Sequence, residues 1–160
     1  MSAVQKSRQK KASRVVFTLT DYSVDRENDQ NLINILLENY SEVYFWPQGI
    51  RDIKYFESLE NTKGITVLSP SVQDYGKLLS ESDIDYVGTR LHAGIYAMQH
   101  KVRSLILVVD NRAADMAVTY NINTVSRDTQ NLADIINSDI ITDIMINEEG
   151  IKEWKSQFLA

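Results

Sequence analysis

Short runs of apolar and β-branched residues alternate with segments of helical periodicity along this chain, and this alternation constrains the fold most. Apolar residues between the runs recur at three- and four-residue spacing, which indicates amphipathic helices. Because the central runs are apolar on both faces, we expect parallel strands covered on both sides. The sequence therefore predicts an α/β, doubly wound, mainly parallel six-stranded sheet, a Rossmann-like domain. The expected strands are 15–19, 43–45, 65–68, 85–88, 105–109 and 122–125.

Capping signals locate several of the expected helices. Asn28 or Asp29 is the expected cap of the first helix, and Ser71 with Asp74 resembles a capping box. Segment 89–99 is expected to be helical, as is 132–137. Segment 140–146 fits either a helix or a strand, and Ile151, Trp154 and Phe158 have the spacing of a closing helix.

The first 14 residues differ in charge from the rest of the chain. The whole chain has 160 residues, with 17 basic and 22 acidic side chains and a net charge of −5. A basic tail is compatible with contact to RNA or an anionic membrane, but a short Ser-, Gln- and Lys-rich segment is typical of a solvated linker. We expect 1–14 to be a linker or disordered tail that follows a preceding N-terminal domain, and 15–160 to be one domain. The tail has no acidic residue and five basic ones: Lys6, Arg8, Lys10, Lys11 and Arg14.

Several classes of protein are excluded by what the sequence lacks. It has no cysteine, so it has no disulfide, zinc–thiolate site or cysteine nucleophile. Its two histidines, eight residues apart, do not make a metal site, and no glycine-rich phosphate loop or G-x-S-x-G elbow is present. The acidic body is a poor match for nucleic acid. No apolar run is long enough to span a bilayer and no signal peptide is recognisable, so we expect a cytoplasmic protein.

Doubly wound sheets bind ligands beyond the carboxyl ends of their strands, where the strand order reverses. With strand order 3-2-1-4-5-6, that point lies between the first and fourth strands. The loops at this point are 20–23 and 88–92, and 46–49 and 110–112 come next outward. We therefore look for a ligand site among the polar residues of these four segments.

The segment Gly88-Thr89-Arg90-Leu91-His92 is the strongest candidate. Gly88 permits a close backbone approach, Thr89 is the expected helix cap, and the free amides of the first turn favour an anion. Arg90 can grip a carboxylate or phosphate at two points, and His92 can act as a general acid beside that anion. Residues two apart diverge by about 200° on a helix, so both reach one ligand only if Arg90 precedes the regular helix.

Structural roles for these residues remain open. Arg90 can instead pair with Asp83 or Asp85, and His92 can be a hydrogen-bonded core histidine. His100, near the end of the same expected helix, suits the helix dipole and is given a structural role. The small residues at 93, 94 and 97 indicate close packing of helix against sheet.

Four further residues are candidates for substrate binding. Asn111 and Arg112 follow the most apolar expected strand, although Asp110 beside them is an ordinary helix cap. Gln48 lies in a Trp-Pro-Gln-Gly segment that reads as a turn, with sugar recognition as its alternative role. Asp21 is a candidate by position alone, and so is Tyr22 beside it, to which no substrate contact is assigned.

The run Asp85-Tyr86-Val87-Gly88-Thr89-Arg90-Leu91-His92-Ala93, with the apolar strand and Asp110-Asn111-Arg112 turn that follow, resembles the polysaccharide pyruvyl transferase family. The resemblance is best over residues 70–126. Arg90 and His92 match the arginine and histidine of the T-R-x-H motif of that family. Arg103-Ser104 departs from the pattern, because relatives commonly have proline before this strand.

The resemblance implies the C-terminal half of a glycosyltransferase-B-like enzyme of polysaccharide biosynthesis. Members transfer a pyruvyl group from phosphoenolpyruvate to a sugar and form a ketal, and they need no other cofactor. The implied partners are a small anionic donor and a sugar or glycan acceptor, with peripheral membrane contact if that acceptor is lipid-linked. Alternatives are the nucleotide-sugar-binding half of a glycosyltransferase and a non-catalytic module that binds an anion or a partner. The isolated domain is expected to need its other half for activity.

Overall fold

A six-stranded, fully parallel sheet forms the centre of the protein. The computed structural model describes residues 7–145 and 147–158. The sheet has the strand order β4-β3-β2-β5-β6-β7, which confirms the predicted order and the doubly wound class. Its strands are β2 (Arg14–Thr18), β3 (Glu42–Phe45), β4 (Thr66–Val67), β5 (Ile84–Gly88), β6 (Arg103–Val108) and β7 (Thr124–Ser126).

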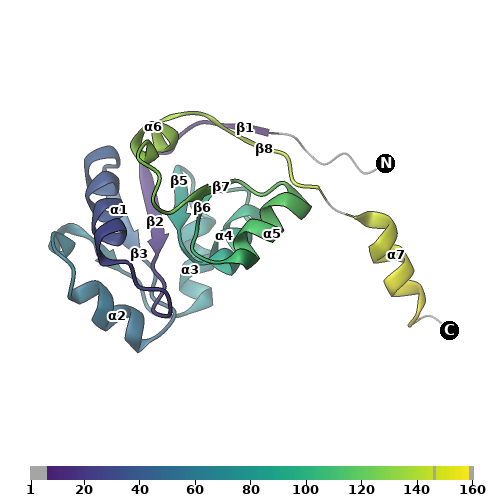
Figure 1. Cartoon of the computed structure of the whole chain (residues 1–160), viewed down its shortest axis with the longest axis horizontal. Helices are drawn as coiled ribbons and strands as arrows, with labels where there is room; N and C mark the ends of the chain where they lie inside the picture. The colour runs from purple at the N-terminus through teal and green to yellow at the C-terminus, as the bar shows by residue number, and fades with distance from the viewer. Residues whose placement is uncertain (1–6, 146, 159–160) are drawn as a thin grey trace.

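Helices cover both faces of this sheet (Figure 1). Apolar residues of α1, α2 and α6 pack on one face, and those of α3 and α4 pack on the other, where α5 adds partly buried residues. The two apolar layers thus divide the core, as a doubly wound sheet requires. The helices are α1 (Arg26–Asn39), α2 (Ile50–Glu57), α3 (Val72–Leu79), α4 (Leu91–Gln99), α5 (Asn111–Tyr120), α6 (Leu132–Asn137) and α7 (Glu148–Ser156), with a 3₁₀ turn at Thr62–Gly64.

The predicted cap of the first helix is wrong, whereas the predicted cap of α3 is confirmed. Asp25 caps α1 by accepting the Asn28 amide at 3.2 Å. Asp29 is buried inside the first turn, because its carboxylate accepts two hydrogen bonds from Arg127 at 2.9 and 3.0 Å. The Ser71 hydroxyl caps α3 as predicted.

The end of the expected tail takes part in a strand pair. Ser7–Gln9 forms β1, which pairs antiparallel with β8 (Ile140–Thr142), at the end of the main sheet opposite the strand carboxyl ends (Figure 1). The prediction of a linker is therefore wrong for these three residues, because they are paired in register with Ile140–Thr142. The same pairing shows that 140–142, the first three residues of the ambiguous segment 140–146, form a strand. Residues 1–6 lie outside the described part of the chain.

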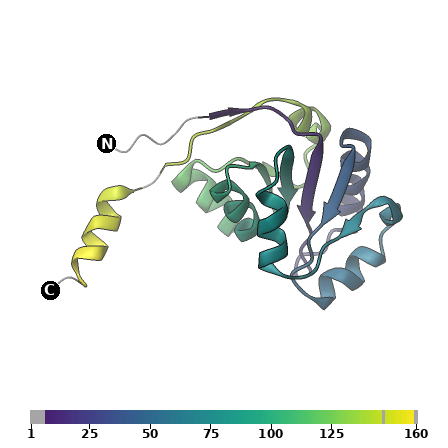
Figure 2. The ribbon, with the colours of Figure 1, turned by 180° about the vertical axis from the view of Figure 1, so that it is seen from behind.

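Helix α7 stands apart from the rest of the protein (Figure 2). The predicted closing helix is present, but Ile151, Trp154 and Phe158 are exposed. The two aromatic rings pack edge to face, with centroids 4.9 Å apart.

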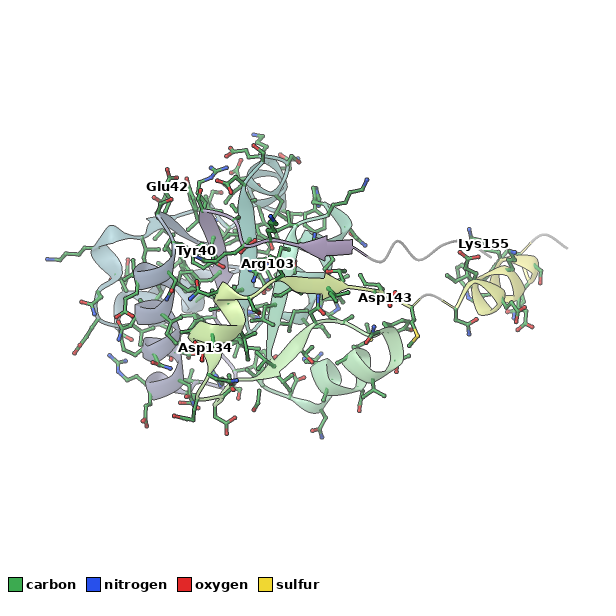
Figure 3. All side chains as sticks on the ribbon, turned by 90° about the horizontal axis from the view of Figure 1, so that it is seen from above. Tyr40, Glu42, Arg103, Asp134, Asp143 and Lys155 are labelled. Atoms are coloured by element: carbon green, nitrogen blue, oxygen red, sulfur yellow. The ribbon has the colours of Figure 1, made fainter. Side chains whose placement is uncertain are left out.

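A buried ion pair joins four elements at the end of the sheet near β1 (Figure 3). The Arg103 guanidinium donates to Asp85 at 2.6 Å, and to the carbonyl oxygens of Ile136 and Ser138, each at 2.6 Å. The Tyr40 hydroxyl donates to the same Asp85 oxygen at 2.8 Å. Burial and the Asp85 carboxylate raise the pKa of Tyr40 well above its usual value, so this hydroxyl stays protonated. Arg103 thus connects α6 to the sheet.

We predict that Asp85→Asn lowers the free energy of unfolding by about 3–5 kcal/mol, because Arg103 would remain buried without its counter-charge. Both side chains are at most 3% exposed. Urea denaturation measures the change, with Asp115→Asn on the exposed face of α5 as the control. Adding Arg103→Met to Asp85→Asn should recover part of the loss. A loss below about 1 kcal/mol, the range of surface pairs, would contradict this role.

Candidate functional site

The turn after β5 is shaped by a close contact with β2. A Cβ atom on Gly88 would lie 2.6 Å from the Thr18 hydroxyl and 2.8 Å from the Thr18 backbone nitrogen. Gly88 is therefore required where the two strands end side by side. The Thr18 carbonyl then accepts the Thr89 amide at 3.2 Å, which fixes the start of the turn.

A chain of hydrogen bonds continues from this contact to the start of α4. The Tyr86 hydroxyl donates to the Arg90 carbonyl at 2.9 Å, so in its 2.7 Å bond with Thr18 it accepts the proton of the Thr18 hydroxyl. Burial raises the pKa of Tyr86, which keeps this donor protonated. Arg90, and not Thr89 as predicted, is the N-cap of α4; its backbone is extended and no side chain caps the helix. Arg90 thus lies before the regular helix, which leaves the amides of the first turn for a ligand.

The Arg90 side chain connects the ends of three segments. Its Nε donates to the Leu19 carbonyl at 3.0 Å, and its Nη2 donates to Asp21 at 3.2 Å and to Asp52 at 2.6 Å. Asp52 is almost fully buried, and its other oxygen accepts the Gln48 amide at 2.8 Å. The two N–H groups on Nη1 make no hydrogen bond to any residue that the structure describes, so they remain available to a ligand.

The expected partners of Arg90 are occupied elsewhere. Asp83 accepts hydrogen bonds from the Ser13 amide and hydroxyl, and Asp85 pairs with Arg103. The expectation that Arg90 pairs with Asp83 or Asp85 is therefore wrong, because both lie near the amino end of β5 while Arg90 follows its carboxyl end.

A polar cavity of about 230 Å³ opens where the strand order reverses between β2 and β5. Its position is the one that a doubly wound sheet favours for ligands. The cavity is lined by Tyr22, Gln48, Thr89, Arg90, Leu91, His92, Asp110, Arg112 and Ala113.

The wall opposite α4 is organised by Asp110. Its carboxylate caps α5 at the Ala113 amide, 3.2 Å away, and accepts from Tyr22 at 3.0 Å and Arg112 at 3.2 Å. Burial opposes its ionisation, but these three donors together hold the pKa of Asp110 below its usual value. The Arg112 side chain is largely exposed, so a ligand can draw it away from this pair at little cost.

The predicted site residues fall into three groups. Gln48, Thr89, Arg90, His92 and Arg112 line the cavity, and Asp21 is held against Arg90. Gly88 shapes the turn without lining the cavity, and Asn111 is exposed at the first position of α5. The exposed His92 side chain is not a core histidine, whereas the Nδ1 of His100 lies 3.0 Å from the Tyr96 carbonyl at the end of α4. The packing expected at Gly94 is confirmed, because a Cβ there would lie 2.5 Å from Ile106.

Tyr22, a candidate by position, lines the cavity, whereas Asp52, which holds Arg90, was not among the predicted site residues. Asp52 shares the buried face of α2 with Phe56, one helical turn later. An acidic residue on the apolar face of a helix needs a buried cation. The spacing of Asp52 and Phe56 in the sequence therefore indicated such a cation. The position of Tyr22 was predicted, but its hydrogen bond to Asp110 was not, because the two residues are 88 positions apart in sequence.

An apolar cavity of about 360 Å³ adjoins the polar one. The two cavities share Gln48 and His92, which lie between them. The remaining walls of the apolar cavity are Trp46, Pro70, Val72, Ala93 and Tyr96.

The described part of the chain contains no cluster of three or more His, Cys, Asp or Glu side chains that could hold a metal ion. Within residues 7–145 and 147–158, no helix combines the length and the apolar character needed to cross a membrane.

No protein-family model and no curated protein matches this chain. Among solved structures, UDP-GlcNAc 2-epimerase from Methanocaldococcus jannaschii, in complex with UDP-GlcNAc and UDP, is similar with a TM-score of 0.59 and 14% identity. The match covers 93% of this chain and 46% of that chain, so this chain spans less than half the length of the epimerase. The similarity shows the fold: the chain resembles one half of a glycosyltransferase-B-type protein.

We predict that Arg90→Lys lowers the free energy of unfolding by about 1–3 kcal/mol, because a single ammonium group cannot serve Leu19, Asp21 and Asp52 together and a buried acceptor is left unsatisfied. Thermal and urea denaturation measure the change. Arg51→Lys, an exposed substitution next to Asp52 on α2, is the matched control. Equal stability of the two variants would show that the contacts of Arg90 do not hold the site together.

Proposed function

We propose that this chain is the donor-binding half of a glycosyltransferase-B-like enzyme that transfers a pyruvyl group from phosphoenolpyruvate to a sugar of a polysaccharide. The observation that carries the proposal is that Arg90 and His92 line one cavity at the carboxyl ends of β2 and β5. The resemblance of segment 85–93 to the polysaccharide pyruvyl transferase family supports the same activity.

The donor has a phosphate and a carboxylate, and the cavity offers three kinds of group to hold them. The first-turn amides of α4 favour an anion through hydrogen bonding and the helix dipole. Arg90 contributes the two free N–H groups on its Nη1, while its other donors stay on Asp21 and Asp52. Arg112 can leave Asp110 and add a second guanidinium. Because three carboxylates lie close by, the amides carry much of the binding.

His92 is the proposed general acid. Protonated His92 delivers its proton to the methylene carbon of phosphoenolpyruvate, using the electron pair of the carbon–carbon double bond, and leaves an oxocarbenium-like centre at the adjacent carbon. A sugar hydroxyl adds there and releases its proton. Phosphate then leaves with the electron pair of its carbon–oxygen bond, and a second hydroxyl adds and loses its proton to complete the ketal. One of the released protons restores His92.

Nucleotide-sugar binding is the second candidate function. The epimerase of similar fold was solved with UDP-GlcNAc and UDP, and an apolar cavity adjoins the polar one here. Such a pair of cavities suits a ligand with a flat ring and a phosphate. A fold supports many activities, so the choice depends on the site itself.

Calorimetric titration of the chain with phosphoenolpyruvate and with UDP-GlcNAc distinguishes the candidates. We expect saturable binding of phosphoenolpyruvate that weakens as salt rises, because the contacts are ionic. Binding of UDP-GlcNAc alone would favour the second candidate. Binding of neither, together with capture of a partner protein, would indicate a non-catalytic module.

We predict that His92→Gln lowers kcat for ketal formation by about 10²–10⁴-fold while it leaves donor affinity nearly unchanged, because general acid catalysis is lost but the anion contacts remain. The assay uses the protein with both halves, phosphoenolpyruvate and a sugar acceptor. His100→Asn, at the other end of α4, is the control and should retain activity. Equal kcat for His92→Gln and the unsubstituted protein would remove His92 from the mechanism.

A further inference from the structure

The apolar cavity is built differently from the polar cavity beside it. Its volume, about 360 Å³, is within the usual range of small-molecule sites. Aromatic and aliphatic side chains form most of its walls, and its polar side chains, Gln48 and His92, are those shared with the polar cavity. A ligand in this cavity therefore meets hydrogen-bonding groups on the side that faces the proposed donor.

Trp46 gives this cavity a rigid aromatic wall. Its ring is stacked on Tyr75, with centroids 3.9 Å apart and planes at 4°. The Trp46 residue is 6% exposed, and its indole N–H is buried without a hydrogen-bond partner in the described part of the chain. A buried indole donor normally finds a partner, so Trp46 is held in place by its stacking on Tyr75 and not by a hydrogen bond.

Tyr96 adds a second aromatic residue to the walls. Tyr96, on the second turn of α4, is partly buried and packs near Tyr75 with ring centroids 5.8 Å apart. The rim is formed by Pro70 and Val72, which are both exposed at the start of α3. Two aromatic residues and an accessible rim suit a flat ring with an apolar face.

We propose that the apolar cavity binds the acceptor sugar, with one C–H face of the hexose ring against Trp46 and Tyr96. This inference rests on the proposed function, because the acceptor must lie within reach of the donor. His92 lines both cavities, so a sugar bound here has its hydroxyl groups beside the proton donor. Gln48 can both donate to and accept from neighbouring hydroxyl groups.

The acceptor explains the distribution of polar groups better than a nucleobase does. A sugar ring has apolar C–H faces and hydroxyls around its edge, which matches apolar walls with amide and imidazole groups on one side. A nucleobase would use the same stacking surface, but the cavity beside it would then have to hold its phosphates and not phosphoenolpyruvate. The two ligands therefore make opposite predictions for competition with the donor.

Trp46 itself reports on occupancy of the cavity. The chain has two tryptophans, and the other, Trp154, lies on the separate helix α7. In a Trp154→Phe background, the fluorescence of Trp46 is followed while methyl glucopyranoside, methyl galactopyranoside or uridine is added. We expect a saturable change with at least one glycoside and none with uridine.

Substitutions at the rim test the place of binding without entering the core. Val72→Arg and Pro70→Arg each put a long side chain across the opening, and each should weaken glycoside binding by about tenfold or more. Val67→Arg, at an exposed position on β4, is the matched control and should leave it unchanged. Phosphoenolpyruvate affinity, measured by calorimetry, should be the same in all three variants. Thermal denaturation confirms that each variant is folded. Two rim variants are used so that the test still works if one of them does not fold.

Each outcome separates this inference from the proposed function. Three results would overturn the acceptor site. The glycoside response could persist in both rim variants, neither glycoside could give a response, or uridine alone could give one. If the chain still binds phosphoenolpyruvate when one of these results is found, the proposed donor site stands although the acceptor site is rejected. If glycosides bind at the rim-dependent site but phosphoenolpyruvate does not bind, the donor assignment fails and the sugar site remains.

Discussion

The contact between Gly88 and Thr18, at the ends of β5 and β2, determines how the site is built. A side chain at position 88 would collide with Thr18. Because Gly88 has none, β5 stays paired with β2 to its last residue and then turns directly into α4. The hydroxyls of Thr18 and Tyr86 fix that turn by hydrogen bonding to the Arg90 backbone. The first amides of α4 are thereby placed at the point where the strand order reverses, which is where parallel sheets bind ligands.

Arg90 combines two roles that compete for its charge. Its bonds to Leu19, Asp21 and Asp52 hold the loops after β2 and β3 together, and they leave one end of the guanidinium for a ligand. We predicted that the Arg90 fork grips an anion at two points, but in the structure its Nε and Nη2 are bound to protein groups and only Nη1 has no hydrogen bond to a described residue. A similar use of arginine occurs at the opposite end of the sheet, where Arg103 joins α6 to Asp85. Acidic residues at the site therefore serve mainly to position cations.

Local patterns predicted the fold and the position of the site, while the contacts inside it depend on residues distant in sequence. Alternating strand and helix periodicity predicted the doubly wound class, and the strand order assumed for that class placed the loops of Gln48, Arg90 and Arg112 near one another, where the structure has one cavity. The position of Asp52 on the apolar face of α2 indicated a buried cation, but not which one, because its partner Arg90 lies 38 residues away. The strand at Ser7–Gln9 was missed because its partner β8 lies more than a hundred residues later, and such pairing leaves no periodic signal in three residues.

The proposed donor site requires that a small anion binds between the start of α4 and the start of α5. Backbone amide NMR during titration of the chain with phosphoenolpyruvate tests it most directly, because each amide reports its own surroundings. We predict that the largest saturable shifts occur at 90–93 and 110–113, with no change in α7. Absence of any saturable shift at millimolar donor, or shifts centred on the β1–β8 end of the sheet, would contradict the claim.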